Sequence, residues 1–222
     1  MRRWEADQTS LLLGDTISLS EAQWHESSLL PGWSRAHIAT HLARNADDIG
    51  WVAVNPRIGL SQLHSPTSKF TELERGADRP GLSLQIDLDT SAGALARSWV
   101  AVTDWHRPVR ILTSQYPLSV LPLIRLHEVC VHHLDLEVNA SLDQIEPAAG
   151  AWLLKWVLHR MESERCSEVS VLSETGVSAT IGRGEPKRQV RGTDAQLWAW
   201  LSGRVGPDNL DGANGLEFVL LS

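Results

Sequence analysis

The stretch LPGWSRAHIATHLARNADDIG, residues 30–50, decides the first half of the fold. Pro31 and Gly32 mark a turn, and Ser34 is a suitable N-cap for a helix that follows it. We expect that helix over residues 35–54, because apolar residues recur there at helical spacing on one face, namely Ile38, Leu42, Ile49 and Val52. His41 and Asn45 border this apolar face. The pattern predicts a helix that packs against a core.

Three more helices with apolar faces are expected in the first half, over residues 3–19, 91–106 and 122–138. The last begins at Pro122, a residue favoured in the first turn of a helix. Four helices predict a bundle. The connection of residues 55–90 is rich in proline and glycine, with a short helix expected near 66–75. It either crosses the bundle or covers one end of a site.

The pattern changes after Pro147. A helix is expected over 148–163, followed by alternating strand patterns and by the stretch RQVRG, at 167–173, 176–182 and 188–192. TDAQLWAWLSGR, residues 193–204, reads as a capped helix, and GLEFVLLS, residues 215–222, reads as a closing strand. We therefore predict an α+β fold with a four-helix bundle over residues 1–145. A small C-terminal domain with a mainly antiparallel sheet follows over 146–222.

Charge and composition exclude several classes of protein. The 222 residues include 20 Lys and Arg against 27 Asp and Glu, a net charge of −7, which offers no basic field for nucleic acid. No apolar run approaches the roughly 20 residues that span a bilayer, and the charged start MRRWEADQTS does not resemble a secretory signal. We expect a cytoplasmic monomer without membrane contact. Cys130 and Cys166 are too few and too far apart for a disulfide framework or a CxxC metal site.

A possible metal site lies in the helix expected over 122–138. Glu128 and His132 are four residues apart and therefore project from one face of that helix. Two facing helices would bring His41 to this pair, and a His₂Glu set suits a catalytic Zn²⁺ with an open fourth position. Asp135, three residues after His132, is placed to orient that histidine.

Other interpretations of these residues stay open. The Glu-x₃-His spacing is only the helical repeat and recurs at Glu21 and His25, so a hydrogen-bonded core pair explains it equally well. His37, one turn before His41, could be the ligand instead. The other candidates on the later helix point to different faces and are assigned to packing or the surface, namely His127, Cys130 and His133. Imidazole and carboxylate ligands would also accept Ni²⁺, Co²⁺ or Fe²⁺.

Residues 30–50 and RLHEVCVHHLDLEV, residues 125–138, together resemble the mycothiol-dependent maleylpyruvate isomerase family. The resemblance extends over essentially the whole chain and is weak through 55–90. It implies a DinB-like four-helix bundle joined to a small domain similar to sterol carrier proteins. It also implies that the family's zinc ligands are His41, Glu128 and His132, and that its C-terminal active-site arginine is Arg204. Taken alone, Arg204 would be only a cation at a helix C-terminus, and Trp33 and Trp99 would be core residues.

The chemistry implied by the resemblance uses two cofactors, Zn²⁺ and the small thiol mycothiol. A zinc-bound thiolate adds to the cis double bond of maleylpyruvate, the bond rotates, and elimination gives fumarylpyruvate, a step in aromatic catabolism. Arg204 would hold a carboxylate of this dicarboxylate substrate or stabilise developing negative charge. Two alternatives stay open. One is a mycothiol S-transferase that conjugates another electrophile at the same site. The other is a non-catalytic binding protein in which zinc, with His37 as a fourth ligand, only stabilises the bundle.

Overall fold

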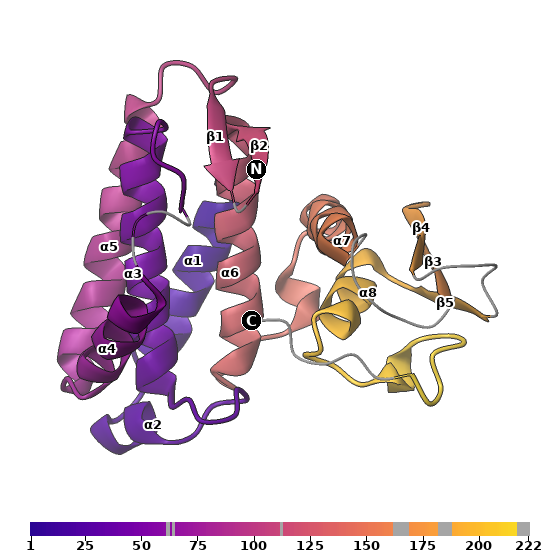
Figure 1. Cartoon of the computed structure of the whole chain (residues 1–222). Coiled ribbons are helices and arrows are strands. Elements are labelled where there is room, and N and C mark those ends of the chain that lie inside the picture. Colours follow the sequence, from indigo (N-terminus) through magenta and orange to yellow (C-terminus); the bar gives the residue numbers. More distant parts are fainter. Residues whose placement is uncertain (61–62, 64, 112, 162–168, 182–187, 217–222) are drawn as a thin grey trace. The chain divides into compact units, whose positions relative to one another are not determined.

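The computed structural model describes residues 1–60, 63, 65–111, 113–161, 169–181 and 188–216. The chain divides into two compact units, residues 1–140 and residues 141–222. Each unit has its own helices and strands (Figure 1).

The first unit is a bundle of four long helices, which run alongside one another (Figure 1). These are α1 (Arg2–Thr16), α3 (Arg35–Val54), α5 (Gly81–Ala101) and α6 (Leu121–Asp135), with the shorter α2 (Glu21–His25) and α4 (Pro66–Ala77) packed around them. Helix α3 packs against α5 and α6, and α1 packs against α6 and α5. Their apolar faces meet in a core that includes Ile38, Leu42, Leu84, Leu95 and Leu126. The predicted α+β class with an N-terminal bundle is confirmed.

Ser34 is the N-cap of α3, as predicted. Its hydroxyl accepts the backbone N–H of His37, and the His37 ring accepts the backbone N–H of Ser34 in return, which forms a capping box. The short helix expected near 66–75 is α4. These boundaries follow from local signals, because caps and prolines act within a single turn.

The prediction for 91–106 was wrong at both ends. Helix α5 begins at Gly81, where Glu21 accepts the Gly81 backbone N–H at 2.7 Å and any larger side chain would collide with the ring of Trp24. It stops at Ala101 because Val102 is extended. The start of α5 depends on residues of another helix, so the apolar spacing does not reveal it.

A two-stranded antiparallel hairpin connects α5 to α6 and was not expected from the sequence. It consists of β1 (Pro108–Ile111) and β2 (Ser114–Pro117), with Val109 opposite Tyr116. Val109 is buried, whereas the rest of β1 lies at or near the surface. Strands this short give too few alternations to stand out from a loop.

The second unit packs α7 (Pro147–Met161) against α8 (Asp194–Leu201) beside a three-stranded sheet. The sheet has the order β4-β3-β5, with β3 (Val169–Ser173), β4 (Ser178–Ile181) and β5 (Arg188–Gly192). Strand β3 pairs antiparallel with β4 and parallel with β5, so the described strands form a mixed sheet. The strand expected over 215–222 lies almost entirely outside the described residues. Cys166 also lies outside them.

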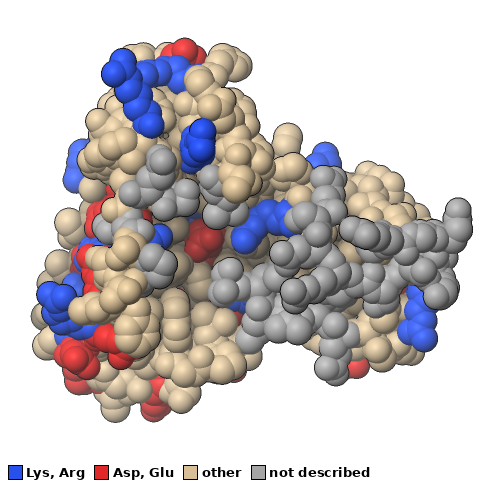
Figure 2. All heavy atoms as spheres, in the orientation of Figure 1, with Lys and Arg blue, Asp and Glu red and all other residues tan. Residues whose placement is uncertain are grey.

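Within the described part of the chain, no helix combines the length and apolar character needed to cross a membrane. On the face seen in Figure 2, acidic and basic side chains are intermixed over the bundle. This mixture agrees with the modest net negative charge of the sequence.

Candidate metal centre

The packing of α3 against α6 brings the three predicted ligands together. Nε2 of His41 lies 3.0 Å from Oε2 of Glu128, and Nε2 of His132 lies 3.6 Å from the same oxygen. The two imidazole rings meet edge to face with centroids 4.7 Å apart. One donor atom from each residue lies within 4.8 Å of the other two.

Two imidazole nitrogens and one carboxylate oxygen are ligands of the kind that zinc takes in catalytic sites. Among the residues described, His41, Glu128 and His132 form the one cluster of three or more His, Cys, Asp or Glu close enough to share an ion. The donor set therefore fits Zn²⁺ with a fourth position open. Whether the cluster binds metal stays a prediction.

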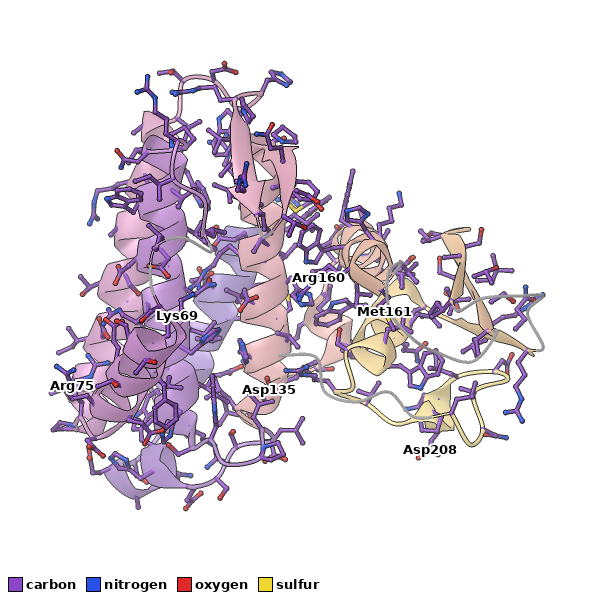
Figure 3. All side chains as sticks on the ribbon, in the orientation of Figure 1. Lys69, Arg75, Asp135, Arg160, Met161 and Asp208 are labelled. Atoms are coloured by element: carbon purple, nitrogen blue, oxygen red, sulfur yellow. The ribbon has the colours of Figure 1, made fainter. Side chains whose placement is uncertain are left out.

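A buried carboxylate orients the second histidine. Nδ1 of His132 lies 2.8 Å from Oδ2 of Asp135, which is 0 % exposed and lies at the C-terminal end of α6 (Figure 3). The backbone carbonyl of Asp135 also accepts the N–H of Leu29 at 2.9 Å, which anchors this end of the helix. A carboxylate on Nδ1 keeps the proton there and leaves Nε2 to act as a ligand.

The charges in the cluster are set by burial and by hydrogen bonds. Burial alone would raise the pKa of Glu128, but its hydrogen bonds to His132 and His41 outweigh burial and hold that pKa well below its usual range. Burial lowers the pKa of His41. Burial also acts to lower the pKa of His132, but the bonds to Asp135 and Glu128 reverse this and raise it. The site thus presents a stable carboxylate and one imidazole that stays neutral at neutral pH.

Trp33 belongs to the site, which corrects its assignment to the core. Its ring centroid lies 5.6 Å from that of His41 and 6.4 Å from that of His132. The planes of the Trp33 and His132 rings are within 14° of parallel. Gly32, at a φ of 81°, makes the turn that precedes it. The sequence places Trp33 in the turn before the capped helix α3, but it does not reveal that this side chain reaches His132 on α6. Trp99 is a core residue as predicted, with its indole N–H donating to Glu5 at 3.3 Å.

His37, the alternative ligand, and the residues assigned to packing or the surface have other roles. His37 completes the α3 cap, and its Nε2 lies 3.6 Å from Oε1 of Glu74. It is not part of the three-residue cluster. His133 pairs with Asp15 on α1 at 2.9 Å, and Cys130 is buried.

A pocket of about 270 Å³ opens beside His41 between α3 and α4. Its walls combine aromatic, apolar and polar side chains, among them Trp33, His41, Asn45, Lys69, Phe70 and Leu73. Lys69 lies near the start of α4 and Arg75 near its end (Figure 3). A small ligand in this pocket would contact a predicted metal ligand directly.

Arg204 lies in the second unit, just after α8. It is 8 % exposed, its backbone N–H donates to the carbonyl of Ala199 at 2.9 Å, and its Nη1 donates to the carbonyl of Ser202 at 2.7 Å. Buried at the end of a helix, it satisfies carbonyls that α8 leaves without partners. Its role toward a substrate stays a prediction.

The model of the mycothiol maleylpyruvate isomerase N-terminal domain matches residues 6–137, more than half of the chain. Two similar crystal structures are a mycothiol-dependent maleylpyruvate isomerase and its variant with one histidine changed to alanine. Each has a TM-score of 0.86 and 22 % identity, and covers 96 % of this chain and 92 % of the other. That likeness shows a shared fold, and no curated protein matches in sequence. The chain belongs to the mycothiol maleylpyruvate isomerase family.

Proposed function

We propose that this protein is a zinc- and mycothiol-dependent isomerase that converts maleylpyruvate into fumarylpyruvate. The observation that carries the proposal is the convergence of His41, Glu128 and His132, the first of which also lines a pocket of about 270 Å³. Membership of a family named for this reaction supports the choice of substrate and thiol.

The residues present fit the proposed metal. Nε2 of His41, Nε2 of His132 and a carboxylate oxygen of Glu128 would hold it, with Asp135 behind His132. When bound, zinc would keep the mycothiol sulfur as a thiolate, able to add to the cis double bond and to leave again after rotation.

The chain's own side chains orient and shield the reacting groups. The Trp33 ring lies beside both histidine rings, and it is proposed to limit the access of water from its side of the site. Arg204 is proposed to hold a substrate carboxylate or to stabilise negative charge on the substrate, for which a permanently charged guanidinium is suited. The buried Cys130, whose pKa is raised by burial, is not needed as a nucleophile.

Metal analysis and a product assay test the proposal. The purified wild-type protein should hold about one zinc per chain by mass spectrometry, and Glu128→Ala should lose it. Wild type should form fumarylpyruvate only when mycothiol is added. If no metal binds, the three residues are a hydrogen-bonded core set and the proposal fails.

Product analysis separates isomerisation from conjugation at the same site. An isomerase returns the thiol unchanged, whereas an S-transferase accumulates a stable thioether. Zinc binding without isomerisation would move the search to other electrophiles. We also propose that the protein acts as a monomer, for which light scattering should give a mass near 24.5 kDa.

A further inference from the structure

The amide of Asn45 is held in one orientation beside the predicted metal ligands. Asn45 follows His41 by one turn of α3 and lines the same pocket. Its Oδ1 accepts a hydrogen bond from Nη1 of Arg125 at 2.8 Å. Because a guanidinium has donors only, the amide oxygen must face Arg125 and the amide nitrogen must face away from it.

Arg125 is itself firmly placed. It lies one turn before Glu128 on α6, is 2 % exposed, and uses its Nη1 a second time to donate to the carbonyl of Leu42 at 2.9 Å. Its Nε has no hydrogen-bond partner among the described residues, and the charges of Glu5, Glu128 and Asp47 act on it electrostatically. Burying this cation is costly, and its two hydrogen bonds to α3, to Leu42 and Asn45, help to offset that cost and hold the Asn45 amide.

The amide nitrogen of Asn45 is available to a ligand. No hydrogen bond to this nitrogen is found among the described residues, and it is not one of the buried atoms left without a partner. It therefore offers N–H donors at a wall of the pocket next to His41. A fixed donor at this position matches the arrangement that stabilises an oxygen on which negative charge develops.

We propose that Asn45 is a catalytic residue that donates a hydrogen bond to the substrate's carbonyl oxygen, and that Arg125 is the positioning residue that fixes its amide. This inference rests on the proposed function. When a thiolate adds to a double bond conjugated to a carbonyl group, the sulfur electron pair forms the new bond and the carbonyl oxygen receives a pair. Elimination returns both pairs, and no proton is transferred. A hydrogen bond to this oxygen strengthens as its negative charge grows, and so lowers the barrier to both the addition and the elimination of the thiolate.

Two substitutions at Asn45 test the donor. Asn45→Asp keeps the shape and an acceptor for Arg125 but removes the N–H groups, and Asn45→Ala removes the amide entirely. Each should lower kcat about 100-fold while zinc content and the KM for the thiol stay unchanged. The matched control is Asn55→Asp. Its amide nitrogen donates to the carbonyl of Trp51 at the exposed end of α3, and kcat should stay at the wild-type value.

Substitution of Arg125 tests the positioning role. Arg125→Met frees the amide to rotate, so kcat should fall by about tenfold with KM for the thiol unchanged. In an Asn45→Ala background the same change should have no further effect on kcat, because the group it positions is gone. A second large drop there would mean that Arg125 acts only through the stability of the bundle. Thermal melting and zinc content show that each variant is folded.

A binding measurement completes the test without turnover. Acetylpyruvate forms an enolate that absorbs in the near ultraviolet, and its titration into zinc-loaded protein reports affinity for an anionic carbonyl oxygen. Asn45→Ala should bind this enolate about tenfold more weakly than wild type, the effect of one hydrogen bond to a charged group.

The outcomes separate the inference from the proposed function. An active wild type with an equally active Asn45→Asp variant overturns the role of Asn45 and leaves the isomerase intact. A wild type that does not isomerise maleylpyruvate overturns the proposed function. In that case, equal enolate binding by wild type and Asn45→Ala also overturns the role of Asn45 as a hydrogen-bond donor. Weaker binding by the variant supports that role.

Discussion

Nδ1 of His132 lies 2.8 Å from a carboxylate oxygen of Asp135, and the neighbouring His133 lies 2.9 Å from a carboxylate oxygen of Asp15. The two pairs are chemically alike but differ in purpose. The first orients a predicted metal ligand, and the second joins α6 to α1. Their likeness makes one the natural control for the other.

Removal of Asp135 should weaken metal binding. In an Asp135→Ala variant the His132 ring loses the partner that fixes its proton on Nδ1, so zinc affinity should fall between about 10-fold and 100-fold. Competition with a chromophoric chelator measures this directly.

Asp15→Ala should lower thermal stability but leave zinc affinity at the wild-type value. If both variants reduced affinity equally, the loss would reflect general loosening of α6 rather than orientation of a ligand.

Metal affinity should depend on pH in two stages. The raised pKa of His132 means that, as pH falls, protons compete with the metal first at this residue, beginning above the ordinary value of 6.5. The lowered pKa of His41 means that its proton competes only below 6.5. Affinity should fall about tenfold per pH unit between the two pKa values, and about 100-fold per unit below both.

Calorimetric titrations between pH 5 and pH 8 would show this change of slope. Asp135→Asn removes a partner that raises the pKa of His132, so the first loss should begin at a lower pH. An affinity that is flat across the whole range would exclude His132 as a ligand.

The core carboxyl of Glu5 should make stability fall as pH rises. Burial raises its pKa above the ordinary 4.5, although Arg125 and hydrogen bonds from Thr9 and Trp99 oppose this. The folded state therefore holds the Glu5 proton more tightly than the unfolded state, which favours folding at low pH. That advantage is lost as pH rises from 4.5 through the folded pKa.

Urea unfolding of wild type and Glu5→Gln at several pH values tests this point. As pH rises from 4 to 7, the free energy of unfolding of wild type should fall relative to that of Glu5→Gln. A constant difference would show that Glu5 has the same pKa in both states.

His37→Ala should separate the cap of α3 from the metal site. The variant loses the side chain that accepts the Ser34 backbone N–H, so the free energy of unfolding should drop by about 1 kcal/mol. Its zinc content should equal that of wild type, whereas His41→Ala should lose the metal. An equal loss of zinc in both variants would point to a closed structural site.

Cys130 should be dispensable for turnover. Its side chain is buried and its pKa is raised by burial, so it is neither exposed nor ionised. Cys130→Ala should keep kcat within about twofold of wild type, at a stability cost of roughly 1–2 kcal/mol for the cavity. A zinc-loaded but inactive Cys130→Ala variant would contradict a mechanism that depends only on an added thiol.

Local signals in the sequence predicted much of the bundle. Ser34 could be recognised as an N-cap, and the shared face of Glu128 and His132 follows from the helical repeat alone. The start of α5 at Gly81 could not be predicted, because it depends on Trp24 from another helix. Short-range rules describe one helix at a time, so they do not reveal such contacts.

The sequence by itself determined which residues of each helix share a face, because the spacing of side chains along a helix is set by its 3.6-residue turn. Only the tertiary structure decided that the face with His41 meets the face with Glu128, and that Trp33 covers both histidines. It also decided the orientation of the Asn45 amide, through a guanidinium on another helix. These relationships depend on how two helices pack, which is settled by the whole core rather than by any one stretch of sequence.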